Sequence, residues 1–188
     1  YRQMSYRLFI ALDLPETVKT ALAALRAPIE GAAWVKPEGF HITLKFLGDS
    51  NDDARLQAVR AALAGIEAQA FDYALRGVGR FPGAVKQPAR VLWVGIQAAD
   101  EFSALWAKVE NRMAKIGFLP ERHPQTVRPH ITLARIKKGG NAGAITAFLE
   151  RHHGFQMAGL RATEFCLFSS QLSPQGATYT RMGSYFLK

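Results

Sequence analysis

The chain has 188 residues, of which 48% are hydrophobic and 21% are charged. This composition is typical of a folded domain with a substantial core and excludes a disordered chain. No apolar run approaches the roughly 18 residues that a membrane-spanning helix needs. The 24 Lys and Arg against 15 Asp and Glu give a formal net charge of +9, which favours an acidic partner, most commonly nucleic acid.

In chain order, the hydrophobic pattern predicts strands and helices in an order that the second half of the chain broadly repeats. The expected strands are 6–14, 34–36, 40–47, 71–78, 91–96, a strand beginning at residue 130, 155–160, 163–172 and 178–187. The expected helices are 16–27, a helix with N-cap candidates at 49–52 that ends near 68, 100–117 and 144–151. Two α+β lobes with a cleft between them are the simplest arrangement of these elements.

A single cysteine, Cys166, lies in an apolar run and cannot form an internal disulfide. We therefore expect a buried thiol and a protein of the reducing cytosol. No signal peptide is recognisable before the first strand, and we expect one domain, from Met4 to residue 188, that acts as a monomer.

The most informative feature is a repeated four-residue word, His41-Ile42-Thr43-Leu44 and His130-Ile131-Thr132-Leu133. Five histidines make few pairs. By chance, the three residues after the histidine would match within a pair in about 0.3% of such chains. In a strand, residues i and i+2 share a face, so each word directs an imidazole and a hydroxyl to one side and Ile and Leu to the other. The words therefore predict two strands that each present a His-x-Thr face to a site.

Two imidazoles and two hydroxyls suit a displacement at one anionic group. With an unperturbed pKa near 6.5, one neutral imidazole can accept a proton from the attacking oxygen while a charged one donates a proton to the leaving oxygen. Threonine hydroxyls can donate hydrogen bonds to phosphoryl oxygens. Neither a metal nor another cofactor is required for this chemistry.

Other interpretations of the histidines are weaker. A lone His-x-Thr commonly has no role beyond ending a strand, but a pair of such words is much harder to explain in that way. A zinc site would need three or four ligands, and the chain has no H-x-H, H-x-x-x-H or C-x-x-C. We expect His152 and His153 to end a solvated helix and His123 to lie in an exposed loop.

Positive charge gathers near both words, which makes a phosphate-bearing substrate the leading class. The residues concerned are Lys36, Lys45, Arg128, Arg135, Lys137 and Lys138.

The paired words and their flanking segments, Arg7-Leu8-Phe9-Ile10-Ala11 and Trp34-Val35-Lys36-Pro37, resemble the 2H phosphoesterases, which share the HxTx motif. The resemblance spans nearly the whole chain and is strongest to the bacterial RNA 2',3'-cyclic phosphodiesterases, also called 2'-5' RNA ligases. It implies an α+β fold of two pseudo-symmetric lobes, mainly antiparallel sheet with helices outside, around a central cleft. It also implies metal-free hydrolysis of a 2',3'-cyclic phosphate at an RNA end, such as a tRNA fragment, to a 2'-phosphate.

By this resemblance, His41 would donate a proton to the departing 3'-oxygen and His130 would activate water. Thr43 and Thr132 would hold the phosphate, as would Arg135, which follows the second word. Simple strand alternation places Arg135 on the face opposite His130, so its role requires a β-bulge or the end of the strand there.

Phe9 and Phe46 are candidates to stack on a terminal base. Core packing is the more common role of such residues, and strand alternation places Phe46 on the core side with Leu44.

Three other activities remain open at this point. The same site can catalyse the reverse reaction, 2'-5' ligation of a cyclic-phosphate end to a 5'-hydroxyl, and other branches of the family cleave 2'-5' oligonucleotides. A protein that only binds RNA ends is a third alternative, although such a protein could hold phosphate with Lys and Arg alone and would not need two histidines.

Overall fold

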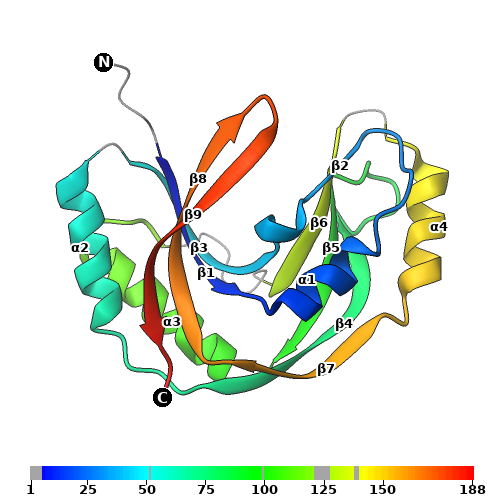
Figure 1. Ribbon diagram of the computed structural model, residues 1–188. Helices are drawn as coiled ribbons and strands as arrows, with labels where there is room; N and C mark the ends of the chain where they lie inside the picture. Colours follow the sequence, from blue (N-terminus) through cyan, green and yellow to red (C-terminus); the bar gives the residue numbers. More distant parts are fainter. Residues whose placement is uncertain (1–5, 51, 99, 121–127, 138–139) are drawn as a thin grey trace.

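A computed structural model describes residues 6–50, 52–98, 100–120, 128–137 and 140–188 (Figure 1). Its strands are β1 (Tyr6–Asp13), β2 (Ala32–Trp34), β3 (His41–Ser50), β4 (Phe71–Phe81), β5 (Val91–Ala98), β6 (His130–Ile136), β7 (Gln156–Ala162), β8 (Glu164–Ser173) and β9 (Gly176–Phe186). Its helices are α1 (Glu16–Ala23), α2 (Asp53–Ala64), α3 (Asp100–Lys115) and α4 (Ala142–His152), with a 3₁₀ turn, η1, at Pro37–Gly39. None of the described helices is long and apolar enough to cross a membrane.

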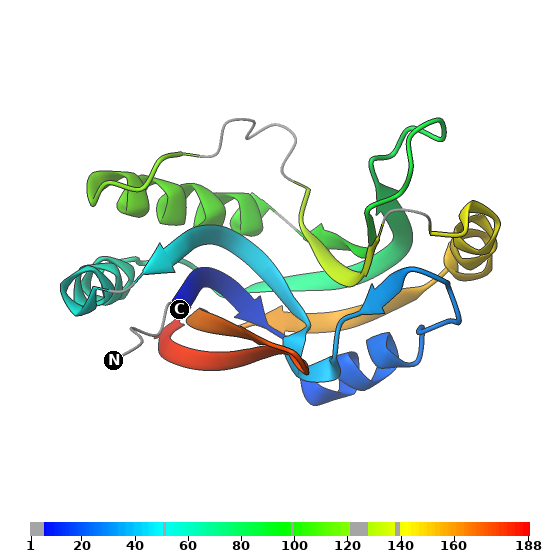
Figure 2. The ribbon, with the colours of Figure 1, turned by 90° about the horizontal axis from the view of Figure 1, so that it is seen from above.

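The strands form two sheets in which every pairing is antiparallel. The first sheet has the order β3-β1-β8-β9, and the second has the order β2-β6-β5-β4-β7. Helix α3 packs against β3 and α2 against β9, whereas α4 packs against β4 of the second sheet. Figure 2 accordingly shows α2 and α3 at one end of the molecule and α4 at the other. The fold is the α+β fold of two lobes that the sequence predicts.

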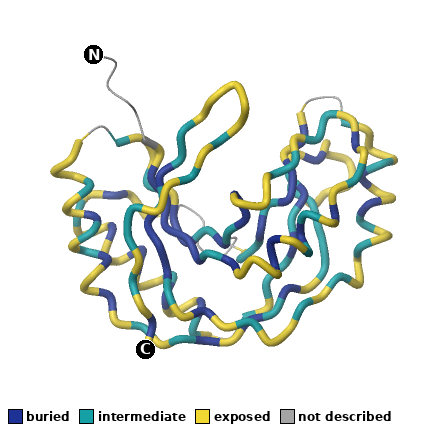
Figure 3. The backbone as a smooth tube through the Cα atoms, in the orientation of Figure 1, coloured by how far each residue is buried: buried dark blue, intermediate teal, exposed yellow. Residues whose placement is uncertain are grey.

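The lobes do not coincide with the two halves of the chain. The C-terminal hairpin β8–β9 returns to β1 and completes the first sheet, while β2 and β4, from the N-terminal half, belong to the second sheet. The buried side chains of both lobes form one continuous hydrophobic core. In Figure 3 the buried stretches follow the inner strands, and the outer sides of α2 and α4 are exposed.

Strand alternation explains how the first sheet contributes to this core. Leu8, Ile10 and Leu12 of β1 are buried on one face. The opposite face of β1 carries Phe9 and Asp13, and it is the face on which His41 lies.

Two helices, α1 and α2, end several residues earlier than expected, and the bounds of α3 and α4 differ from the expected ones by one or two residues. Helix α1 ends at Ala23, because the chain leaves the helix through tight turns that precede Pro28. Helix α2 ends at Ala64, before Gly65. The capping predictions are confirmed by Asp52, whose carboxylate accepts a hydrogen bond from the backbone N–H of Ala54 at 2.9 Å.

Candidate active site

The strands that begin with the repeated words, β3 and β6, lie against each other although one belongs to each sheet (Figure 1). Within each word the Ile and Leu side chains are fully or almost fully buried, and the His and Thr residues are partly exposed. The predicted division of each word into a core face and a polar face is therefore confirmed.

Both imidazoles are held in the same way by the backbone. Nδ1 of His41 lies 2.7 Å from the carbonyl oxygen of Gly39, and Nδ1 of His130 lies 2.7 Å from that of Arg128. A carbonyl oxygen only accepts hydrogen bonds, so Nδ1 carries the proton in both rings. The neutral form of each ring then has its lone pair on Nε2, the atom available to a substrate.

A β-bulge interrupts each motif strand at the last residue of the word. In β3, Thr43 pairs with Ala11 and Lys45 with Ile10, which leaves Leu44 as the extra residue. The bulge reverses the alternation of the strand beyond it. Phe46 consequently lies on the face of His41 and is 66% exposed, so the prediction that it packs in the core is wrong.

The second bulge has the equivalent effect on Arg135. In β6, Thr132 pairs with Trp93 and Ala134 with Leu92, which leaves Leu133 as the extra residue. Arg135 therefore shares the face of His130 and Thr132 and is exposed, as its expected role requires. Phe46 and Arg135 occupy equivalent positions, each five residues after the motif histidine.

An aromatic ring supports each imidazole from its own lobe. The ring of Phe9 lies 4.6 Å from that of His41, and the ring of Phe81 lies 5.0 Å from that of His130, measured between centroids. Phe9 is 3% exposed and also stacks on Phe168 at 5.4 Å. Phe9 therefore combines the core packing expected of it with a position beside the site, and its burial leaves no free face for a base.

Burial is the main influence on the charge of His41: it lowers the pKa of the imidazole to about 4. The Gly39 carbonyl and the carboxylate of Asp13 act in the opposite direction, whereas Arg135 and His130 add to the lowering. His41 is thus neutral at pH 7 in the free protein. The influence of Arg135 and His130 on His41 also indicates that the two lobes present these groups to one shared site.

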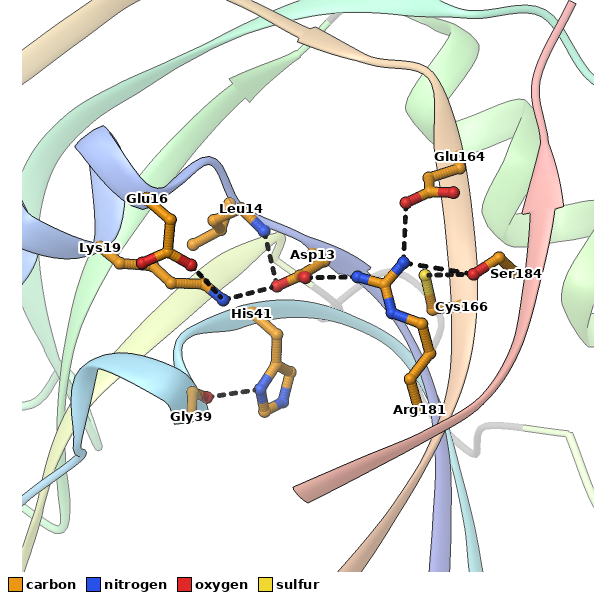
Figure 4. Close-up of polar contacts among 10 residues, drawn as sticks. All are labelled: Asp13, Leu14, Glu16, Lys19, Gly39, His41, Glu164, Cys166, Arg181 and Ser184. Carbon is orange, nitrogen blue, oxygen red and sulfur yellow. Dashed lines mark hydrogen bonds and ion pairs between the residues drawn. The ribbon is translucent and has the colours of Figure 1, made fainter. Parts of the chain in front are cut away.

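Asp13, the residue that pairs with His41 in the sheet, is the centre of an ion-pair network (Figure 4). Its carboxylate forms an ion pair with Lys19 at 3.0 Å and accepts a hydrogen bond from Arg181 at 2.6 Å. Arg181 also binds Glu164 at 2.9 Å. The network ties β1, α1, β8 and β9 together behind His41.

Three side chains can bind an anion between the histidines. The hydroxyls of Thr43 and Thr132 form no hydrogen bond, and Arg135 forms no ion pair, with any other residue that the structure describes. The two hydroxyls and one guanidinium are donors suited to phosphoryl oxygens.

Not all the basic residues near the words face this site. Lys45 is 6% exposed and donates hydrogen bonds to Glu110 at 2.8 Å and to the Leu119 carbonyl at 3.0 Å, so its charge is not presented to a substrate although it lies next to the first word. Lys36 donates a hydrogen bond to the carbonyl of Gln175 in the β8–β9 turn. Arg128 and Lys137 are exposed. Lys138 lies outside the described residues.

The remaining histidines and the cysteine take no part in the site. His152 ends α4 and His153 caps it, as predicted, while His123 lies outside the described residues. Cys166 is buried, as predicted, and burial raises the pKa of its thiol. Within the described part of the chain, no group of three or more His, Cys, Asp or Glu side chains could hold a metal ion.

Sequence reasoning did not find three residues beside the histidines. Phe81 supports His130, Asp13 pairs with His41, and Tyr179 lies 6.0 Å from the His41 ring between centroids. Arg135 also lowers the pKa of Tyr179, although burial raises it overall. Their partners come from distant parts of the chain, so no local pattern marks them. Asp13 carried the one available signal, a charged residue at the end of an apolar strand.

Known proteins that are similar to this chain agree with the geometry. The family model of LigT-like phosphoesterases matches it twice, over residues 12–93 and 94–179, and each match contains one of the repeated words. An RNA 2',3'-cyclic phosphodiesterase of Methanothermobacter thermautotrophicus is 32% identical over 186 residues, which cover 95% of this chain and 97% of that protein.

Solved structures show the same fold. The crystal structure of TT0787 of Thermus thermophilus matches with a TM-score of 0.72 and 28% identity, and it covers 96% of this chain and 97% of that one. E. coli LigT in its apo form matches with a TM-score of 0.74 and 23% identity, covering 98% and 99% of the two chains. The resemblance to the 2H phosphoesterases is confirmed, and the chain belongs to the LigT-like phosphoesterase family.

Proposed function

We propose that this enzyme opens the 2',3'-cyclic phosphate at an RNA end and leaves a 2'-phosphate, without a metal ion. The observation that carries the proposal is the matched pair of imidazoles, each with Nδ1 bound to a backbone carbonyl and Nε2 available to substrate. One such ring can act as the base and the other as the acid of a single displacement. The relatives named as RNA 2',3'-cyclic phosphodiesterases support this choice of substrate.

In the proposed step, Nε2 of His130 takes a proton from water as the water oxygen attacks phosphorus. The bond from phosphorus to the 3'-oxygen breaks, and His41 gives its Nε2 proton to that oxygen. Thr43, Thr132 and Arg135 donate hydrogen bonds to the remaining phosphoryl oxygens and stabilise the charge that builds there.

The acid role of His41 depends on the substrate, because the pKa of this imidazole is about 4 in the free protein. A negatively charged phosphodiester within a few ångströms favours the charged imidazolium and raises that pKa. Substrate binding and protonation of His41 are therefore coupled.

The test is to incubate the protein with an oligonucleotide that ends in a 2',3'-cyclic phosphate and to identify the product. We expect a 2'-phosphate whose formation EDTA does not slow. His41→Ala and His130→Ala should each lower the rate by about 10² to 10⁴, and the double variant should lose far less than the product of the single losses. A 3'-phosphate product, or one variant with nearly the parent rate, would contradict the proposal.

A substrate with sulfur in place of the 3'-oxygen separates the acid from the base. A thiolate leaves without a proton, so loss of the acid should matter little for this substrate, while loss of the base should matter as before. We expect His41→Ala to recover most of its activity with the sulfur substrate and His130→Ala to recover none. The opposite result would exchange the two roles.

A further inference from the structure

A hollow of about 470 Å³ lies in the second sheet beside His130, and the proposed hydrolysis of a terminal phosphate does not use it. Its volume is within the range of sites that bind small molecules. The hollow is lined by Arg76, Trp93, Gly95, Gln97, Arg128 and Pro129, among others.

The hollow adjoins the second word of the active site. On β5, Trp93 pairs with Thr132 and Gly95 pairs with His130, so these two lining residues share the face that carries the second word. Arg128, at another wall, is the residue whose backbone carbonyl holds Nδ1 of His130. A molecule in the hollow therefore lies next to the phosphoryl group that His130 serves.

The floor of the hollow offers an aromatic surface. Trp93 pairs with Gly79 of β4, and a Cβ placed on Gly79 would lie only 2.1 Å from an indole carbon of Trp93. The missing side chain thus lets the indole lie directly over the strand. The ring of Phe81, 5.3 Å away between centroids, packs beside the indole. Such a supported indole is a suitable platform on which a base can stack.

The charge of the hollow is positive. Its charged lining side chains within the described part of the chain are Arg76 and Arg128, both exposed at its walls. Arg76 makes a long contact of 3.4 Å with the side-chain oxygen of Gln97, which spans β4 and β5. Two guanidinium groups around an aromatic floor match the chemistry of a nucleotide, which combines a phosphate with a flat base.

We propose that this hollow binds a second nucleotide next to the reacting phosphate, with its base on Trp93 and its phosphate between Arg76 and Arg128. The proposal rests on the proposed function, since it takes the group between the histidines to be an RNA phosphate. The second nucleotide has two possible sources. It is either the residue that precedes the terminal nucleotide or the first residue of a strand joined through its 5'-oxygen.

Arg76→Glu tests the proposal, because Arg76 is not one of the catalytic groups. Reversing the charge of this side chain turns its attraction for a phosphate into repulsion. The variant is compared with the parent on three substrates: a cyclic mononucleotide, a dinucleotide ending in a cyclic phosphate, and a 2'-5'-linked dinucleotide whose second residue carries a 3'-phosphate. Arg151→Glu, an exposed residue of α4 that does not line the hollow, is the matched control for the change in net charge.

We expect kcat/KM of Arg76→Glu to fall by about ten-fold or more for at least one dinucleotide and to stay within about two-fold of the parent for the mononucleotide. A lower kcat/KM for the dinucleotide that ends in a cyclic phosphate assigns the hollow to the preceding residue. A lower kcat/KM for the 2'-5'-linked dinucleotide assigns it to the 5'-linked strand. Equal losses on all three substrates, no loss on any, or the same losses in Arg151→Glu would overturn the proposal.

A binding measurement separates this proposal from the proposed function. In His41→Ala, the affinity for each uncleaved dinucleotide is measured with and without Arg76→Glu. If the parent does not hydrolyse the dinucleotide that ends in a cyclic phosphate, the proposed function fails. The hollow still stands if Arg76→Glu weakens dinucleotide binding, and it falls if that affinity is unchanged.

Discussion

At the scale of single residues, the histidines are oriented by peptide carbonyls rather than by carboxylate side chains. A peptide group does not titrate, so the proton on Nδ1 stays in place over the working pH range of the enzyme. Each ring can then gain or lose a proton only at Nε2. This arrangement suits two rings that must hold opposite protonation states at the same moment.

The lowered pKa of His41 predicts how stability depends on pH. The unfolded chain takes up a proton at this residue near pH 6.5, but the folded protein takes it up only near pH 4. This difference lowers the free energy of unfolding as the pH falls from about 6.5 to about 4. Below that range, this loss of stability is complete. His41→Gln should therefore gain stability relative to the parent across this window, as measured by Tm at a series of pH values.

His153→Gln, at the exposed end of α4, is the control for that experiment. Parallel Tm curves for the parent and His41→Gln between pH 7 and pH 4 would show that burial does not suppress the charge of His41.

The threonines permit a test in which stability and activity separate. Thr43→Val and Thr132→Val keep the shape and strand preference but remove the hydroxyl, which forms no hydrogen bond within the described structure. Tm should change little. A hydrogen bond to a charged group is worth about 1.5 to 3 kcal/mol, so kcat/KM should fall by roughly 10-fold to 150-fold for each variant. Parent-like rates in both variants would remove the threonines from the phosphate site.

At the scale of elements, the two bulges decide which residues reach the site. The repeated words were enough to predict both strands, their polar faces and the four His and Thr positions, because alternation is a local property. Arg135 could be placed at the site only on the condition that a bulge or the end of the strand came before it. The position of Phe46 was predicted wrongly. A bulge depends on pairing with β1 or β5, and the sequence of the strand itself does not reveal it.

Phe9 and Phe46 pair with each other across β1 and β3 but differ in exposure, and this contrast gives a further prediction. Phe9→Ala should lower the stability by about 3 to 5 kcal/mol, because it empties a buried position beneath His41. Phe46→Ala should leave Tm nearly unchanged and weaken nucleotide binding by about 1 to 3 kcal/mol if a base stacks on this ring. Thermal melts and binding of a cyclic mononucleotide measure the two effects. Parent-like binding by Phe46→Ala would exclude the stacking role.

Long-range contacts also explain why Lys45 does not face the site. Lys45 follows the first word directly, and its charge is among those that made a phosphate-bearing substrate the leading class. The first bulge lies between it and Thr43, and its ammonium is buried against Glu110 of α3. The ion-pair partner lies far away in the sequence, so charge near a motif was a poor guide to which cations face the substrate.

At the scale of the whole molecule, the net charge of +9 predicts a dependence on salt. Arg76, Arg128 and Arg135 lie along the face that carries the second word, and a longer RNA can contact them through several phosphates. Binding of such an RNA should weaken steeply as salt rises, because each phosphate contact releases counterions. A cyclic mononucleotide should show a smaller slope in the same titration. Equal slopes would show that the surface beyond the phosphate site does not bind RNA.

The number and type of the elements followed from periodicity, but the assignment of elements to lobes did not. Sequence order suggested two similar halves, whereas the structure exchanges strands between them. Which strands pair across such distances depends on packing of the whole core, which no local window contains.

The return of β8 and β9 to the first sheet has a consequence for how the enzyme folds while it is synthesised on the ribosome. A nascent chain that has reached Ala162 already contains both histidines, yet its first sheet consists of β1 and β3 alone. Arg181, which binds Asp13 beside His41, is synthesised later than the other residues of the ion-pair network. The earliest part of the active site is thus completed by the last strand to be translated, and the surroundings of His41 take their final form only when β9 has emerged.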